Sequence, residues 1–246
     1  MAFSITELPK KYKKDFRFSY ARGPFPVFEA LDAVPRNVLG VFIHENFNEK
    51  QKLENLCKEK NIPYRYSAKA LQKISDKDIC YAAAAIQKHQ TPLEDAPHIV
   101  LVNPADMGNL GTIIRTVLGF GISNLAVIEP SADVFHPKVI RASMGAVFRM
   151  NLQLFPNFES YYRIFNAHDI FPFMLDGAKE LTPKTCPPSQ KYSLVFGNEA
   201  SGLPSEFQNY GQSLLIPQTK WVDSLNLAIS VGIGTYIFTQ NSLKLG

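Results

Sequence analysis

The sequence has few cysteines and no arrangement of residues typical of a metal site or a disulfide framework. Its three cysteines, Cys57, Cys80 and Cys186, are far apart, with no CxxC pair and no histidine at metal-ligand spacing. They are interpreted as reduced structural thiols, and no bound metal is expected. The first residues also lack the apolar core of a secretory signal, and the apolar stretch Leu225–Phe238 is too short to span a bilayer. A cytoplasmic protein without a membrane partner is therefore expected.

Charge is also scarce, and its distribution is uneven. Charged residues make up 20% of the 246 residues, and the net charge is only +4. Residues 1–91 hold 16 Lys and Arg against 10 Asp and Glu, a net +6, whereas residues 92–246 hold 10 against 12, a net −2. The basic first third would attract a polyanion such as RNA. Ordinary solubilising lysines explain the same excess equally well.

The pattern of apolar residues indicates two domains, a first at residues 1–92 and a second at 98–246. The first alternates expected helices and strands, which predicts a small α/β domain. The intervening segment, QTPLEDAPH, is polar and holds two prolines, as a linker does. The expected elements of the first domain are a helix at 24–34, a strand at 37–44, a helix at 48–61 and an extended segment at 63–68.

The second domain has short apolar runs at regular intervals, separated by segments long enough for helices. This alternation predicts an α/β fold with a mostly parallel sheet covered on both faces. Ser224 is expected to cap a buried terminal helix in which Leu225, Ala228, Ile229 and Ile233 share one face. The runs are HIVLVNP, NLAVIEP, NLQLF, IFPFML, YSLVFGN and QSLLIP.

Ligands of parallel α/β sheets bind beyond the carboxyl ends of the strands, so the residues after each expected strand are of interest. In the first such segment, NPADMGNLGTIIRTVLGFG, Asn109 stands where a helix begins and Arg115 follows six residues later. That spacing places Arg115 nearly two turns beyond Asn109, from where a long side chain can still reach back. The alternative is a capping asparagine and a surface arginine.

The second segment, LVFGNEASGLP, ends a strand at Gly197, places Glu199 in a tight loop and turns again at Gly202. It is not a phosphate-binding loop, because Leu203 and Pro204 stand where a Walker motif needs Lys and Ser or Thr. No Rossmann fingerprint is present either. Such a loop can bring backbone groups close to a flat polar cofactor such as an adenine nucleoside, or it is simply a turn.

The third segment, IPQTKWVDSLNLAIS, brings Ser224, Leu225 and Asn226 to the start of the terminal helix. Polar side chains there cap the helix, bind a ligand, or do both.

Together, NLGTIIR, RASMGAVFR, FGNEASGLP and IPQTKWVDSLNLAIS resemble, in this order, the motifs of the SpoU-type branch of the SPOUT RNA methyltransferases. The resemblance covers residues 98–246 well. The first 90 residues are only loosely similar to the small ribosomal-protein-like substrate-binding domain of many members. The resemblance implies a C-terminal deep trefoil knot that holds S-adenosylmethionine, and a homodimer. The general rarity of knots means that this architecture rests on the resemblance alone.

The resemblance also implies roles for individual residues. Gly197, Ile216 and Leu225 should contact the cofactor, largely through their backbones. Asn109, Arg115, Glu199, Ser224 and Asn226 should form the polar set that methylates a ribose 2′-hydroxyl without a metal. A guanidinium does not deprotonate in proteins, so Arg115 is expected to hold a phosphate and stabilise charge on the attacking oxygen. Water, a phosphate oxygen or Glu199 would accept the proton, unless Glu199 is structural.

The expected substrate is RNA, with ribosomal RNA favoured because an additional domain gives a second contact surface for a large folded target. The alternatives are a transfer RNA methyltransferase and a non-catalytic RNA-binding relative. A different α/β transferase or an oxidoreductase is disfavoured, because both nucleotide-binding fingerprints are absent.

Overall fold

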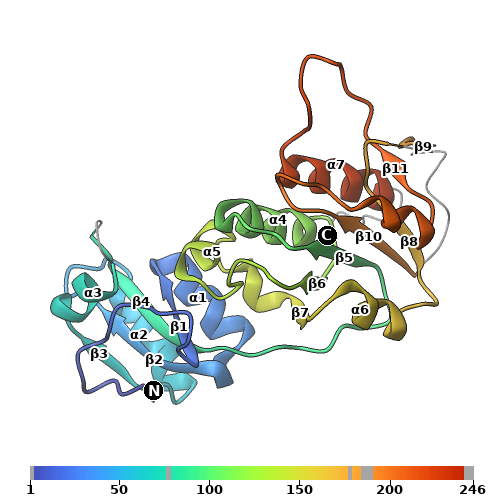
Figure 1. Ribbon diagram of the computed structural model, residues 1–246. Coiled ribbons are helices and arrows are strands. Elements are labelled where there is room, and N and C mark those ends of the chain that lie inside the picture. Colours follow the sequence, from blue (N-terminus) through green and yellow to red (C-terminus); the bar gives the residue numbers. More distant parts are fainter. Residues whose placement is uncertain (1–2, 76–78, 177–178, 184–190, 241–246) are drawn as a thin grey trace. The chain divides into compact units, whose positions relative to one another are not determined.

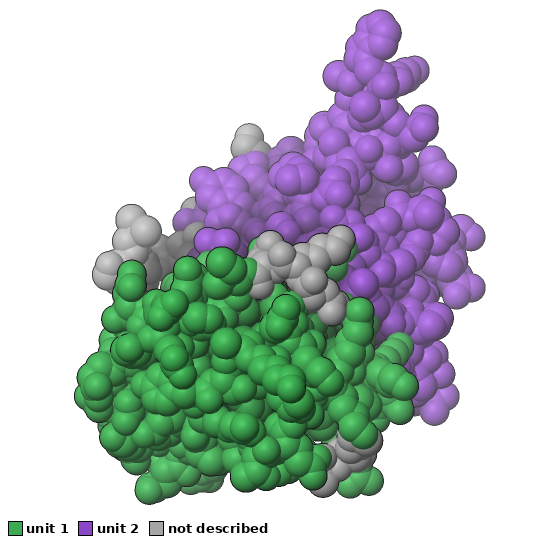
Figure 2. Space-filling view, turned by 90° about the vertical axis from the view of Figure 1, so that its left-hand side faces the viewer, with its two compact units in different colours: residues 1–89, 133–149 green, residues 90–132, 150–246 purple. Residues whose placement is uncertain are grey.

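The computed structural model describes all residues except 1–2, 76–78, 177–178, 184–190 and 241–246, so Cys186 lies outside the described residues. The chain forms two compact units, which Figure 2 shows in different colours. The first unit comprises residues 1–89 and 133–149, and the second comprises residues 90–132 and 150–246. The units are therefore not contiguous in sequence, whereas the sequence predicts contiguous domains at 1–92 and 98–246.

The first unit has a four-stranded mixed sheet in the order β1-β4-β2-β3. The four elements predicted at 24–68 form as α1, β2, α2 and β3, each within a few residues of its expected bounds. The strands are β1 (Phe18–Arg22), β2 (Val38–Ile43), β3 (Tyr64–Tyr66) and β4 (Ala82–Gln87). The helices are α1 (Pro24–Ala33), α2 (Lys50–Glu59) and α3 (Ala68–Ile74), with a 3-10 turn at Pro35–Asn37.

Strand β4 is central to this sheet although no strand is predicted there. It pairs antiparallel with both β1 and β2, and its four alanines, 82–85, are completely buried. Alanine favours helices in isolation, so position in the sheet outweighs the local preference. The small side chains let α1 and α3 pack closely on this sheet.

Residues 133–149 join the first unit through a buried and partly ionic contact. They contain α5 (Pro137–Ala142) and a 3-10 turn, Ala146–Arg149. Arg149 bonds Glu29 at 2.8 Å and Asp32 at 2.5 Å, both on α1. Gly145 has φ +83°, and a Cβ there would lie 2.8 Å from the Cβ of Glu29. The glycine therefore permits both the turn and the close approach.

The second unit contains a five-stranded sheet in the order β7-β6-β5-β10-β8, and every neighbouring pair is parallel. The predicted parallel α/β architecture of this region is confirmed. Strands β5, β6 and β10 are buried along their whole length, as strands covered on both faces must be. The strands are β5 (His98–Val102), β6 (Asn124–Ile128), β7 (Asn151–Phe155), β8 (Asp169–Pro172) and β10 (Tyr192–Phe196).

Helices lie on both faces of this sheet (Figure 1). On one face, α4 (Met107–Gly119) and α7 (Leu227–Thr239) pack against each other. On the other, α6 (Phe158–Ile164) and the 3-10 helix Ser205–Asn209 cover a core that includes Val100, Ala126 and Val195. A small separate sheet pairs β9 (Lys179–Glu180) with β11 (Leu214–Leu215). No helix in the described part of the chain is long and apolar enough to cross a membrane.

The terminal helix differs from the prediction at its start and on one face. Its N-cap is Asn226 rather than Ser224, because the Asn226 Oδ1 accepts the backbone N–H groups of Ala228 and Ile229. Ser224 and Leu225 precede the helix. Ala228 is buried as expected, but Ile229 and Ile233 are 56% and 36% exposed, so the expected burial of these two side chains is wrong for the single chain.

The amino ends of the parallel strands enclose a buried polar network. His98 Nδ1 lies 2.8 Å from the Tyr161 hydroxyl, and that hydroxyl lies 2.6 Å from the Ser193 Oγ. His168 Nδ1 lies 3.0 Å from the same Ser193 oxygen. The backbone carbonyl of Glu94 bonds the second nitrogen of His98. These side chains are almost fully buried, and their mutual bonds satisfy most of their polar atoms.

Candidate active site

The loop after β10 is shaped by two glycines. A Cβ at Gly197 would lie 2.2 Å from the backbone carbon of Gly202 and 2.4 Å from the nitrogen of Leu203, so only glycine fits. Gly202 has φ +66°, which glycine adopts without strain. Asn198 supports the turn, because its Oδ1 accepts the N–H groups of Ala200 and Ser201. The loop therefore folds its own backbone tightly at Gly197, and its approach to a cofactor stays a prediction.

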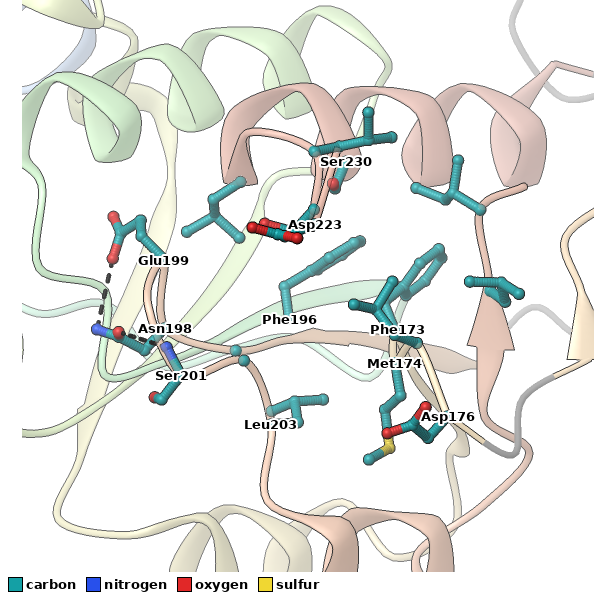
Figure 3. Close-up of a pocket in the computed structure, with 18 of the residues that line it drawn as sticks. Phe173, Met174, Asp176, Phe196, Asn198, Glu199, Ser201, Leu203, Asp223 and Ser230 are labelled. Atoms are coloured by element: carbon teal, nitrogen blue, oxygen red, sulfur yellow. Dashed lines mark hydrogen bonds between the residues drawn. The ribbon is translucent and has the colours of Figure 1, made fainter. Parts of the chain in front are cut away.

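A pocket of about 430 Å³ opens at the carboxyl end of β10, which is the edge where ligands of such sheets bind. Phe173 and Phe196 stack inside it with centroids 4.3 Å apart, and Asp223 approaches them from beneath α7 (Figure 3). The pocket is lined by segments 173–176, 196–203 and 214–216, and by residues 205, 208, 218, 223–225, 227 and 230. It therefore combines aromatic surface, three carboxylates at Asp176, Glu199 and Asp223, and exposed backbone.

A chain of hydrogen bonds connects the three loops singled out in the sequence. Glu199 accepts the backbone N–H groups of Ala105 and Asp106, each at 3.0 Å. The Asn109 side-chain amide donates to Glu199 Oε1 at 3.4 Å, and the Asn226 amide donates to Asn109 Oδ1 at 3.1 Å. The starts of α4 and α7 are thus tied to the loop after β10.

These contacts determine the ionisation of Glu199. Burial alone raises the pKa of this carboxyl, but the backbone N–H groups of Ala105 and Asp106 and the Asn109 amide lower it below its ordinary value. The opposing hydrogen bonds prevail because they stabilise the charged form. Glu199 is therefore an ionised acceptor whose two oxygens are both engaged.

The structure places the predicted site residues in three groups. Gly197, Ile216 and Leu225, the expected cofactor contacts, all line the pocket. Glu199 and Ser224 line it as well. Asn109 and Asn226 stand behind Glu199 in the hydrogen-bonded chain and are not among the lining residues.

Arg115 is the exception among the predicted residues. Its side chain is exposed on α4, is not part of the pocket lining, and makes no hydrogen bond or ion pair to any residue that the structure describes. The N-cap of α4 is Asp106, whose Oδ1 accepts the N–H of Asn109 at 2.7 Å, so the expected capping role of Asn109 is wrong.

Several lining residues are missed by the sequence argument. Phe173 and Phe196 belong to apolar runs that predict strands, and nothing in those runs marks which aromatic faces a pocket. Asp223 and Asn198 adjoin the predicted Ser224 and Gly197, so the rule of inspecting strand ends could have included them. Asp176 belongs to the segment after β8, where no site was expected. Among the described residues, no group of three His, Cys, Asp or Glu is arranged to hold a metal.

The fold and the position of the pocket define an α/β protein with a ligand site at the carboxyl edge of a parallel sheet. The chain belongs to the SpoU rRNA Methylase family, whose model matches residues 96–236.

Two relatives illustrate the sequence similarity. The chain is 26% identical over 156 residues to the 23S rRNA (guanosine(2553)-2′-O)-methyltransferase of Bacillus subtilis, covering 63% of this chain and 62% of the relative. It is 34% identical over 142 residues to a ribosomal RNA small subunit methyltransferase G of Syntrophobacter fumaroxidans, covering 58% of this chain and 27% of the relative. The chain thus spans less than two thirds of each relative.

Two solved structures illustrate the structural similarity, one over nearly the whole chain and one over little more than half of it. An rRNA methyltransferase from Sinorhizobium meliloti with bound AdoMet superposes with a TM-score of 0.80 at 26% identity, covering 93% of this chain and 89% of that one. A structure described as concerning 2-OH methylation of C/U34 on tRNA has a TM-score of 0.53 at 29% identity. It covers 58% of this chain and 93% of that chain.

Proposed function

We propose that this protein transfers a methyl group from S-adenosylmethionine to a ribose 2′-hydroxyl of RNA, with ribosomal RNA as the favoured substrate. The observation that carries the proposal is the chain Glu199–Asn109–Asn226 beside the pocket, which joins three of the four motifs of the SpoU resemblance. Family membership and the 2′-O-methyltransferase activity named for the Bacillus subtilis relative support it.

The pocket residues fit S-adenosylmethionine. Stacked aromatic and aliphatic side chains, including Phe196 and Leu203, suit a flat purine, and about 430 Å³ lies in the range of small-molecule sites. Asp176 and Asp223 suit the positive charges of a sulfonium and an ammonium group. Gly197, Ile216 and Leu225 would hold the cofactor, largely through their backbones. When bound, it would supply an electrophilic methyl group to an attacking oxygen.

Glu199 acts in this proposal as an anchor rather than as the general base. A carboxylate with a lowered pKa and two engaged oxygens is a poor proton acceptor. It instead fixes the start of α4 against the loop after β10. Asn109 and Asn226 extend this rigid frame towards Ser224, which faces the pocket and is free to orient the ribose. The proton then passes to water or to a phosphate oxygen of the RNA.

Arg115 binds RNA in this proposal. Its guanidinium is exposed and cannot serve as a base, but it can hold a phosphate and stabilise negative charge on the attacking oxygen. The proposal includes a homodimer, supported by the exposed apolar face of α7 at Ile229, Ile233 and Tyr236. A second copy on this face would lie beside α4, because α4 packs on α7.

The remaining parts of the proposal concern the rest of the chain. Residues 1–92, with a net charge of +6 over residues 1–91, act as the RNA substrate-binding domain and resemble a ribosomal protein. The C-terminal part of the second unit forms a deep trefoil knot, supported by family membership. A cytoplasmic location is supported by the RNA substrate and by the free buried thiols of Cys57 and Cys80.

The test is transfer of labelled methyl from S-adenosylmethionine to total RNA from a strain that lacks this gene. The wild-type protein should label RNA, and Arg115→Ala should reduce the rate at least about 100-fold without changing cofactor affinity, because this side chain is exposed and outside the pocket. Label in ribosomal RNA supports the favoured substrate, whereas label in transfer RNA supports the alternative. Cofactor binding without transfer to any RNA would contradict the proposal and support the alternative of a non-catalytic RNA-binding protein.

A further inference from the structure

Trp221, the single tryptophan of the chain, is 92% exposed. It lies in the segment between β11 and α7, which projects from the rest of its unit at the top of Figure 1. We propose that Trp221 is a stacking platform for an unpaired nucleobase next to the ribose that the protein methylates. This inference deepens the proposed function and rests on it.

The loop places Trp221 close to the pocket, although Trp221 is not one of the residues that line it. Gln218 Nε2 donates to the backbone oxygen of Asp223 at 3.2 Å and so closes the neck of the loop. Both residues line the pocket, and the four residues between them, Thr219–Val222, are all exposed. The indole is thus attached to the pocket rim by a hydrogen-bonded neck. Ser224 and Asn226 follow it within five residues.

Exposure of this degree is unusual for an indole. Tryptophan is highly buried on average, because its large apolar surface is costly to leave in water. Every aromatic contact recorded in the described residues involves Phe, Tyr or His, and none involves Trp221. The exposed indole beside the pocket is therefore available to stack on a flat group of a bound ligand.

The chemistry of the loop favours RNA over protein as that ligand. Lys220 precedes Trp221 and supplies a cation for a neighbouring phosphate, while the indole supplies a π-face for a base. Stacking of unpaired bases on aromatic side chains is a common way for proteins to hold single-stranded RNA. Trp221 and Val222 alone offer too little surface for a stable protein interface. A continuous apolar face is instead present on α7, at Ile229, Ile233 and Tyr236.

A stacking platform has a defined kinetic signature. It binds the base equally in the ground state and the transition state, so its loss raises KM for RNA and leaves kcat little changed. Base stacking on an aromatic ring is typically strong enough that its removal weakens binding about tenfold. Phenylalanine keeps a π-face and leucine keeps only apolar bulk, so the two substitutions separate stacking from hydrophobic contact.

The experiment uses the fluorescence of the wild-type protein, in which Trp221 is the sole indole. Titration with purified ribosomal RNA from a strain lacking the gene should quench this emission with the same midpoint as RNA binding. In methyl transfer to the same RNA, Trp221→Leu should raise KM about tenfold, Trp221→Phe about threefold or less, and neither should change cofactor affinity. Ile164→Ala, which shortens a 61% exposed side chain on α6, is the matched control and should leave KM unchanged.

The contrary outcomes are distinguishable. Normal transfer with unquenched emission and an unchanged KM for Trp221→Leu overturns the stacking role and leaves the proposed function standing. Emission that shifts with protein concentration in the absence of RNA also overturns it, because a second copy of the chain then covers the indole. Failure of the wild-type protein to methylate any RNA refutes the proposed function, and the stacking role with it.

Discussion

The two edges of the parallel sheet in the second unit use polar residues in opposite ways. At the amino edge, His98, Tyr161, Ser193 and His168 bond one another in a buried cluster. At the carboxyl edge, Glu199, Asn109 and Asn226 also bond one another, but beside an open pocket. The amino-edge network is part of the packed interior, whereas the carboxyl-edge network supports the loops around a pocket.

The difference shows why the presence of a polar cluster does not by itself identify a site. Both clusters contain groups with shifted pKa values: burial lowers the pKa of His98 to about 4, and hydrogen bonds lower that of Glu199. At the carboxyl edge, loops leave backbone groups and aromatic faces open to the pocket. Changes at the amino edge should therefore affect stability, and changes at the carboxyl edge should affect binding and turnover.

The largest expected effect is at the carboxyl edge. Gly197→Ala places a methyl group against the backbone of Gly202 and Leu203, and the loop must move. Overpacking of this kind costs about 3 kcal/mol, which corresponds to about 100-fold weaker cofactor binding if the cost falls on the pocket. Calorimetric titration with S-adenosylmethionine measures it.

Gly119→Ala is the control for this change. A Cβ at Gly119 meets nothing within 4 Å at the end of α4. Cofactor affinity should be unchanged, and stability should rise by up to about 1 kcal/mol because alanine favours the helix. Equal affinities for the two variants would show that the Gly197 loop does not shape the binding site.

The next effect concerns pH and belongs to the amino edge. An unfolded histidine titrates near pH 6.5, whereas the folded pKa of His98 is about 4 and that of His168 is also lowered by burial. Below about pH 6.5 the unfolded chain binds protons that the folded chain does not, so stability falls as the pH drops towards 4. The loss for His98 is on the order of 3 kcal/mol. Denaturant unfolding from pH 7 to 4.5 should show it, and a flat profile would place these histidines in contact with water.

A smaller effect is expected when the hydroxyl that connects the amino-edge network is removed. Tyr161→Phe leaves His98 Nδ1 without its partner and removes one of the two partners of Ser193 Oγ, which costs about 2 kcal/mol of stability. The value of kcat should not change. Tyr162→Phe, one residue further on and only partly buried, should change stability by less than about 0.5 kcal/mol. A fall in kcat for Tyr161→Phe at a temperature where the protein is folded would contradict the separation of the two edges.

The smallest effect distinguishes an anchor from a base at the carboxyl edge. Glu199→Gln retains one acceptor oxygen, but its NH₂ group then faces the backbone N–H of Ala105 or Asp106, so two donors meet. If Glu199 is an anchor, Glu199→Gln should lower kcat/KM about tenfold and leave the pH dependence of kcat unchanged. A loss of several thousandfold together with a changed pH profile would instead identify it as the proton acceptor.

Sequence reasoning predicts the second unit better than the first. Its central strands β5, β6 and β10 are largely apolar because both of their faces are covered, and such runs can be recognised without a structure. In the first unit, β4 is a run of alanines, and its strand conformation depends on pairing with β1 and β2. The packing of residues 133–149 against α1 likewise depends on contacts far apart in sequence, such as that of Arg149 with Glu29.

For the candidate site, motifs predict which loops matter but not which side chains face the pocket. Gly197, Ile216 and Leu225 all line the pocket, because each lies in one of the loops that the motifs mark. Phe173 directly follows β8 and Phe196 ends β10, so their stacking joins segments that are far apart in sequence and no local pattern encodes it. Arg115 stands apart because six residues of helix rotate it away from Asn109, a separation that the spacing already indicated.

The most direct test of the central claim is to locate the methyl group in the product. A ribose 2′-O-methyl group blocks alkaline cleavage of the next phosphodiester, since that cleavage needs the free 2′-hydroxyl. Ribosomal RNA labelled by the wild-type protein with S-adenosylmethionine should, after complete alkaline hydrolysis, carry its label in resistant dinucleotides. Label recovered only in mononucleotides would mean that a base is methylated, and the assignment of the carboxyl-edge pocket to ribose 2′-hydroxyl methylation would be contradicted.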